Sequence, residues 1–372
     1  MAQQHLDPKD PAAEVVTGDA LAAYLRTQAT EFLRALRLHR ETGGAGGGAP
    51  ARDRSGVGEN GAKESVDAAR ALRRSARRIS GSLHTFRPLL DPGWSEEMRP
   101  ELAWLSGTLG LEHACEARLD RLLLALHRLS GAAVLPAQAI DAAVAAGAPV
   151  AVKNTSGPAT AAPERGNLTV GAAKAGALLE RQLTLARTRA HSTALQALGS
   201  SRFHAVADKV AVLASEVPLT PGAPTADLRP LAAAAEERLT DAIVALPLVV
   251  AGHPYNAEAL VHGLSPDPAP HPQDGPWHQV RLLLRLHRYA QETLHGGKLP
   301  VDARLLTAGQ ALNRHRDASE AAAAAAQAAR TPRIAPATAY ALGVLHADQR
   351  HEVEAARYAF QQAWQMQTVS AP

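Results

Sequence analysis

The sequence predicts an all-α protein, from its composition and from the helical spacing of its apolar residues. Hydrophobic residues make up 46% of the 372-residue chain, whereas aromatic residues make up only 3%. A core with so few aromatic rings has to be built from alanine and leucine, which are the strongest helix formers. Because chains of this length usually form more than one hydrophobic core, we expect two helical units.

The first half of the chain, residues 13–214, is expected to hold four helices. Apolar residues recur on one face from Gly18 to His39, and a second, arginine-rich helix follows and ends before Pro88. A third helix is expected at 96–129, and a fourth at 172–213 with a break near Gly199. Glycine and proline predict loops at 42–61 and 132–167, and the first loop lacks the GK[ST] of a phosphate-binding loop.

Residues 218–227 form the predicted linker, because Pro218, Pro221 and Pro224 cannot continue either flanking helix. Four more helices fit the second half, residues 228–368, and they are expected at 228–246, 276–294, 301–329 and 337–366. Each half then carries an arginine-rich helix in second place, which is a weak internal repeat. The sequence therefore predicts two four-helix bundles related by approximate two-fold pseudo-symmetry, with a basic groove between them.

Two of these helices carry a stripe of positive charge. The first stripe contains Arg70, Arg73, Arg77 and Arg78, and the second contains His278, Arg281, Arg285 and Arg288 at i, i+3, i+7 and i+10. The formal net charge of the chain is only +3, so an anion site has to come from such clustering. Because the guanidinium fork stays charged and binds phosphate oxygens in pairs, these eight residues are the predicted ligands of a polyanion.

Other classes of protein find little support in the sequence. Cys115 is the only cysteine, which excludes a disulfide framework and favours a reducing cytoplasm. The first residues lack the features of a signal peptide, and no apolar run is long enough to cross a membrane. His113 lies near Cys115 without a partner motif for zinc, and no catalytic signature occurs. We therefore expect no metal, no cofactor and no enzymatic activity.

The order and spacing of the motifs resemble the CHAD family, an α-helical domain named for a conserved histidine. The first stripe is similar to its pattern V-H-x-x-R-V-x-x-R-R-L-R-x-x-L-x-x-F at Arg73, Arg77, Arg78, Ile79, Leu83 and Phe86. Arg70 stands where the family has its histidine, and Ser80 replaces the last motif arginine. The second stripe resembles L-H-x-x-R-x-x-x-K-R-x-R-Y-x-x-E at His278, Arg281, Arg288, Tyr289 and Glu292, with Arg285 in place of lysine.

The resemblance spans nearly the whole chain and implies a single CHAD domain over residues 1–372. It implies a non-enzymatic protein that binds inorganic polyphosphate in a basic cavity, in the cytoplasm and at polyphosphate granules. One alternative is a degenerate CHAD protein that serves as a helical protein-interaction scaffold. The other is a basic-groove binder of nucleic acid or nucleotides, against which the scarcity of aromatic rings for base stacking argues. His278 is expected to switch binding with pH, since a protonated imidazole adds a charge.

Overall fold

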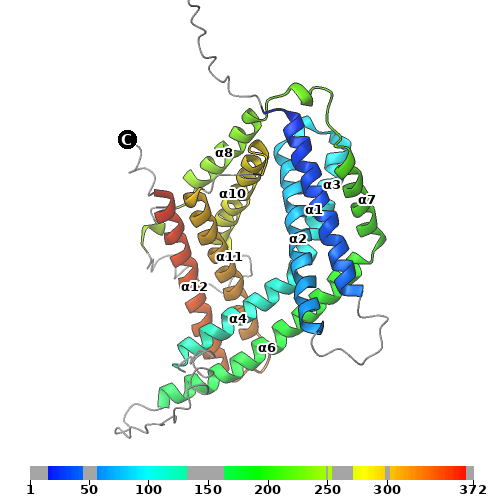
Figure 1. Ribbon diagram of the computed structural model, residues 1–372. Coiled ribbons are helices and arrows are strands. Elements are labelled where there is room, and N and C mark those ends of the chain that lie inside the picture. The colour runs from blue at the N-terminus through cyan, green and yellow to red at the C-terminus, as the bar shows by residue number, and fades with distance from the viewer. Residues whose placement is uncertain are drawn as a thin grey trace, which may run out of the picture. The chain divides into compact units, whose positions relative to one another are not determined.

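The structure is a computed structural model and describes residues 16–44, 57–131, 163–248, 250–253, 271–297 and 302–365. Within these residues the regular elements are α-helices and short 3-10 turns (Figure 1), which confirms the all-α prediction. None of the described helices combines the length and apolar content needed to cross a membrane.

The chain divides into two compact units that are built from interleaved segments. Unit 1 comprises Met1–Gly110, Thr193–Ile243 and Leu282–Val301, and unit 2 comprises Leu111–Ser192, Val244–Arg281 and Asp302–Pro372. The predicted halves, residues 13–214 and 228–368, instead follow chain order, and the predicted linker at 218–227 lies inside unit 1. The two-fold pseudo-symmetry and the groove between two bundles stay predictions.

Unit 1 contains a bundle of four helices. These are α1 (Gly18–Gly44), α2 (Val57–Thr85), α3 (Pro92–Thr108) and α7 (Ser201–Ser215). Each contacts two of the others, in the order α1, α2, α3 and α7 and back to α1 (Figure 1). Phe32, Phe86 and Phe203 lie fully buried in the core that they enclose. Leucine and alanine fill most of that core, as the composition predicts.

Helices extend into the described ends of both predicted loops. Helix α1 continues to Gly44 and α2 begins at Val57, so both enter the predicted loop at 42–61. Helix α6 (Pro163–Leu198) begins within the predicted loop at 132–167, because proline suits the first turn of a helix. Residues 45–56 and 132–162 lie outside the described residues.

The predicted helix at 96–129 is wrong, because the chain forms two helices there. Helix α3 starts earlier, where the side chain of Asp91 accepts a hydrogen bond from the backbone N–H of Trp94, and it ends at Thr108. Helix α4 (Leu111–Leu129) follows after a turn. The guanidinium of Arg73 lies where Gly110 would carry a Cβ, and its Nε donates to the carbonyl of Ser106 at 3.0 Å. A side chain from α2 thus caps the end of α3.

The segment predicted as a linker is a structured part of unit 1. The backbone N–H of Asp91 donates to Pro218, that of Thr220 donates to Leu89, and that of Leu228 donates to Val16. Prolines do end the helices here, as the sequence predicts, but the free backbone groups pair with the neighbouring segments. Helices α8 (Arg229–Val244) and α10 (Gly275–Leu294) come after it, and α10 enters unit 1 from Leu282 onward.

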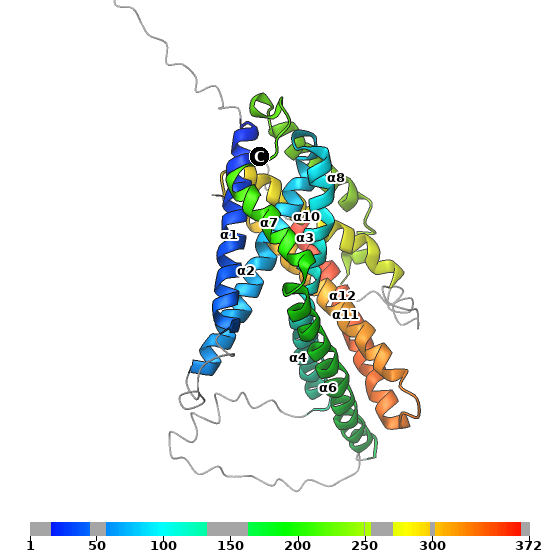
Figure 2. The same ribbon diagram turned by 90° about the vertical axis from the view of Figure 1, so that its right-hand side faces the viewer.

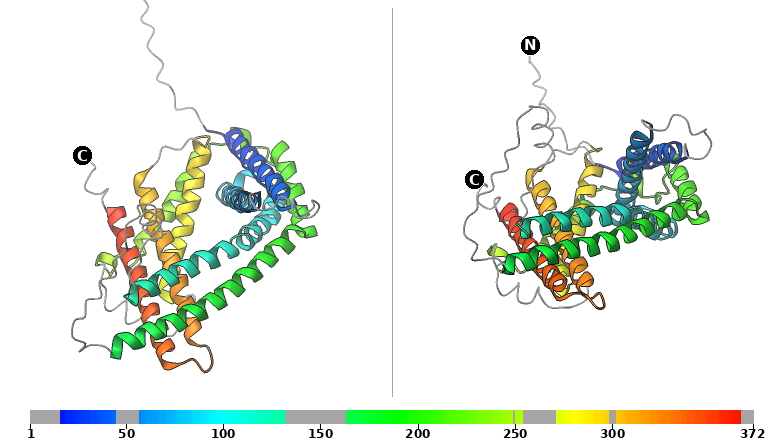
Figure 3. Two further views of the ribbon diagram at one scale, coloured as in Figure 1. Left: turned by 60° about the horizontal axis from the view of Figure 1, so that its bottom comes forward. Right: turned by 90° about the horizontal axis from the view of Figure 1, so that it is seen from below.

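Unit 2 is built on helices α4, α6, α11 (Ala303–Ala329) and α12 (Pro336–Gln365). Helices α4 and α6 run side by side in this unit (Figures 2 and 3), and α4 also contacts α11 and α12. Small buried residues such as Ala321, Ala325 and Ala328 of α11 pack against Ala341 and Leu345 of α12. Because alanine side chains are short, these two helices approach closely along their length.

Candidate functional site

A cavity of about 660 Å3 lies within unit 1, between α2, α3 and the part of α10 that belongs to this unit. Each helix presents residues at i, i+3, i+4 and i+7, which is the spacing of one helical face. On α2 these residues are Arg77, Ser80, Gly81 and His84. Arg285 of α10 lines the same cavity, so the structure brings a residue of each cationic stripe together.

Positive charge predominates in this cavity, which we call the arginine cavity. Arg77, Arg99 and Arg285 line it, and Glu96 is the one carboxylate among its described lining residues. Glu96 Oε1 lies 3.3 Å from Nη1 of Arg99 and 2.8 Å from Nε of Arg87. The formal charge of the lining side chains is therefore positive, and an anion would be attracted to the cavity.

His84 holds Arg99 in the arginine cavity. Nη2 of Arg99 lies 3.0 Å from Nδ1 of His84. Burial lowers the pKa of His84 below its ordinary value, and the charges of Arg99, Arg238 and Arg87 lower it further. The imidazole is therefore neutral at pH 7, and its Nδ1 accepts a hydrogen bond from the guanidinium.

Two polar residues of the arginine cavity, His84 and Arg99, were not predicted from the sequence as site residues. His84 lies two helical turns beyond Arg77 on the same face of α2, so its spacing carried a signal. Arg99 lies on α3, which carries no cationic stripe, and only the packing of α3 against α2 brings it into the cavity.

Gly81 is required where α2 meets α10. A Cβ at Gly81 would lie 2.5 Å from Cδ2 of Tyr289, whose side chain is buried. We expect Gly81→Ala to lower the free energy of unfolding by about 1–3 kcal/mol through overpacking, as measured by urea denaturation. Gly107→Ala in α3 is the control, because its Cβ meets nothing within 4 Å. That change should stabilise the protein by about 0.5–1 kcal/mol, and equal effects of the two changes would contradict the packing argument.

Arg78 and Arg288, one from each stripe, share a carboxylate in unit 1. Nε of Arg78 lies 2.8 Å from Glu292 Oε2, and Nε of Arg288 lies 3.3 Å from Glu292 Oε1. The hydroxyl of Tyr24 also donates to Glu292, at 3.0 Å. Burial raises the pKa of Tyr24 and the charge of Glu292 raises it further, so the phenol keeps its proton. Neither arginine is among the residues that line the arginine cavity.

The remaining arginines of the first stripe also contact the protein. Nη1 of Arg70 lies 3.2 Å from Asp67 on the exposed side of α2. Arg73 donates to Ser106 at the end of α3, as described above. Of the first stripe, Arg77 is therefore the residue that the structure places in the arginine cavity.

The start of the second stripe lies in unit 2, against α11. Nε of Arg281 donates to Oδ1 of Asn313 at 2.8 Å. The ring of His278 meets that of His315 edge to face, with 5.5 Å between the ring centroids. Burial lowers the pKa of His278 from its ordinary value, although Asp274 opposes the shift. This shift favours the neutral imidazole, and the pH switch at His278 stays a prediction.

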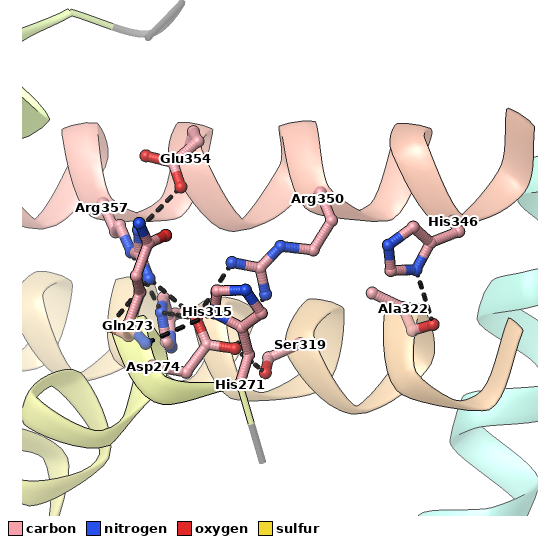
Figure 4. A network of polar contacts seen from close by, with 10 residues as sticks. All are labelled: His271, Gln273, Asp274, His315, Ser319, Ala322, His346, Arg350, Glu354 and Arg357. Carbon is pink, nitrogen blue, oxygen red and sulfur yellow. Dashed lines mark hydrogen bonds and ion pairs between the residues drawn. The ribbon is translucent and has the colours of Figure 1, made fainter. Parts of the chain in front are cut away.

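A buried polar network joins the start of α10 to α11 and α12 in unit 2 (Figure 4). At its centre is Asp274, which is 0% exposed. Its carboxylate lies 2.8 Å from Nη1 of Arg350 and 2.7 Å from Nη2 of Arg357, and it accepts from Ser319. Burial raises the pKa of Asp274, but the hydrogen bonds and the charge of Arg350 outweigh burial and hold that pKa well below its usual range.

The network is completed by a second carboxylate. Glu354 lies 2.7 Å from Nη1 of Arg357, in the next turn of α12. Burial raises the pKa of Glu354, and both Arg357 and Arg350 oppose that shift. No residue of this network belongs to the predicted stripes. Among the described residues, no group of three or more His, Cys, Asp or Glu side chains is placed to hold a metal ion.

Comparisons with known proteins identify the family. Residues 54–300 match the model of the CHAD domain, whereas no curated protein matches the chain. Among solved structures, PptA from Streptomyces chartreusis is 67% identical, with a TM-score of 0.72, and the match covers 94% of this chain and 99% of that chain. The crystal structure of the CHAD domain from the plant Ricinus communis is 16% identical, with a TM-score of 0.47, over 99% of this chain and 98% of that one. Because the family model covers more than half of the chain, the motif resemblance is confirmed and the protein belongs to the CHAD family.

Proposed function

We propose that this protein binds inorganic polyphosphate, with the arginine cavity as the centre of the site and without chemical change to the polymer. The observation that carries the proposal is that Arg77 and Arg285, one from each stripe, line one cavity together with Arg99. Guanidinium groups form paired, charge-assisted hydrogen bonds with phosphate oxygens. Several of them around one cavity suit a ligand that carries a negative charge on every unit.

Other lining groups fit the same ligand. Ser80 also lines the cavity, and a hydroxyl can donate to a phosphate oxygen. The described lining of the cavity contains no tryptophan or phenylalanine, and Tyr289 packs on Gly81. The lining therefore suits a phosphate backbone better than a stacked base.

The predicted contacts outside the arginine cavity are part of the proposal. Arg70, Arg73, Arg78 and Arg288 of unit 1 would contact the polymer or hold the helices that form the cavity, and His278 and Arg281 of unit 2 would be separate contacts of the polymer. We propose that the protein acts in the cytoplasm, and that binding of the polymer recruits it to polyphosphate granules.

The test is a comparison of affinities across salt concentration for long-chain polyphosphate, short oligophosphates, RNA and DNA. We expect long-chain polyphosphate to bind most tightly, and the logarithm of its affinity to fall linearly with the logarithm of salt, because contacts with phosphates release condensed counterions. Electrophoresis of the recovered polymer is the control and should show an unchanged chain length. Tighter binding of RNA or DNA would favour the nucleic-acid reading, and binding of none of the four polymers would favour the scaffold.

A further inference from the structure

The His278 and His315 rings form a pair in unit 2, beside the buried network. His315 is 1% exposed and stacks on Trp277, with 5.6 Å between the ring centroids and 26° between the ring planes. His278, the next residue of α10, meets the same ring edge to face at 79°. Two ring nitrogens here, Nε2 of His278 and Nδ1 of His315, are buried and have no hydrogen-bond partner among the described residues.

The contacts of Nε2 of His315 determine which of its two ring nitrogens carries the proton. Nε of Arg357 donates to Nε2 of His315 at 3.3 Å, so this nitrogen is the acceptor. Asp274 Oδ1 lies 3.6 Å from the same nitrogen, beyond the range of a hydrogen bond. Arg357 is itself held, since its other nitrogens contact Glu354 and Asp274. A neutral imidazole carries one proton, so His315 has it on Nδ1, the nitrogen without a partner.

The same reasoning extends to His278. Its buried Nε2 is on the side away from solvent, and the ring is partly exposed, which leaves Nδ1 as the accessible nitrogen. Nδ1–H of His315 needs an acceptor, and Nε2 of the adjacent His278 ring can be one. If Nε2 of His278 accepts, its proton is on Nδ1 and faces outward.

We propose that Arg357 and His315 set the tautomer of His278, so that His278 offers an outward Nδ1–H as a neutral hydrogen-bond donor to a phosphate oxygen. This inference rests on the proposed function, because it assigns His278 a role in binding the same polymer. His315 and Arg357 are then positioning residues, and His278 is the residue that meets the ligand.

The charges around the pair favour neutral rings. Arg281, Arg316, Glu320 and Asp274 face His278, and Arg357, Asp274 and His278 face His315. Burial lowers the pKa of His315 to about 4, with Arg357 adding to the effect and Asp274 opposing it. Because both pKa values lie below the ordinary value, both rings are neutral between pH 7 and 8. His278 then offers its Nδ1–H as an uncharged donor.

The tautomers can be measured without any ligand. Two-dimensional proton–nitrogen spectra of the full chain with 15N-labelled histidine distinguish Nδ1–H, Nε2–H and doubly protonated rings. Signals are assigned by their loss in His278→Asn and in His315→Phe, the latter keeping an aromatic ring against Trp277. At pH 7.5 we expect Nδ1–H for both residues, and in His315→Phe we expect His278 to gain the Nε2–H form. An Nε2–H or doubly protonated His278 in the unsubstituted protein would overturn the proposal, whatever the protein binds.

Binding gives the second readout. The amide of asparagine places an N–H donor close to the position of Nδ1, so His278→Asn should keep the affinity for long-chain polyphosphate within about threefold. His278→Ala removes the donor and should weaken binding by about tenfold or more, the effect of one hydrogen bond to a charged phosphate oxygen. Equal losses in the two variants would overturn the role of His278 as a donor. If the unsubstituted protein binds no polyphosphate, the proposed function fails, whereas the spectra still decide the tautomers.

Discussion

Replacement of Asp274 by asparagine is expected to lower the free energy of unfolding by about 3–5 kcal/mol, the usual cost of breaking a buried ion pair from one side. Asp274 is 0% exposed and lies between Arg350 and Arg357, which are 2% and 5% exposed. Asparagine has nearly the same shape but no charge, so two buried guanidinium groups would lose their main counter-charge. Glu354 contacts Arg357 and would compensate only part of this loss.

Urea denaturation followed by tryptophan fluorescence is the measurement, because Trp277 is buried next to this network. Asp120→Asn on α4 is the control, since Asp120 is exposed and the substitution makes the same change in charge. We expect the control to change the free energy of unfolding by less than about 0.5 kcal/mol. A similar small effect for Asp274→Asn would mean that the network does not hold α10, α11 and α12 together.

The double substitution Arg77→Ala and Arg285→Ala is expected to weaken the binding of long-chain polyphosphate by well over tenfold. Both residues line the arginine cavity. A hydrogen bond to a charged group contributes about 1.5–3 kcal/mol, and about 1.4 kcal/mol corresponds to a factor of ten in affinity. The loss should be larger at low salt, where electrostatic attraction is screened least.

Fluorescence titration with labelled polyphosphate at two salt concentrations would measure this effect. Arg26→Ala with Arg34→Ala on α1 is the matched control, because both arginines are exposed, lie in unit 1 and lie outside the cavity lining. This pair removes the same formal charge and should change the affinity by less than about threefold, as distant exposed charges are screened. Equal losses for the two pairs would show that net charge, and not the arginine cavity, controls binding.

The sequence predicted the helices better than it predicted their grouping. The periodicity of the apolar residues locates α1, α10, α11 and α12. Each of these helices buries one face, so its apolar residues recur at helical spacing in the sequence. The predicted helix at 96–129 failed since the turn at Leu109 and Gly110 depends on Arg73, which comes from another helix. The interleaving of the two units likewise depends on contacts between segments far apart in the chain.

The sequence by itself determined the all-α class, the CHAD motifs and the two cationic stripes, because these follow from residue type and helical spacing. It also placed Arg77 and Arg285 on faces that the structure brings to one cavity. Only the tertiary structure decided that Glu292 engages Arg78 and that Arg99 joins the cavity from α3. The physical reason is that the charge of a side chain follows from its residue type alone. The burial of that side chain and its ion-pair partners depend on how the helices pack. Burial of His278 against His315 likewise lowers the pKa of His278, which its place in the motif did not reveal.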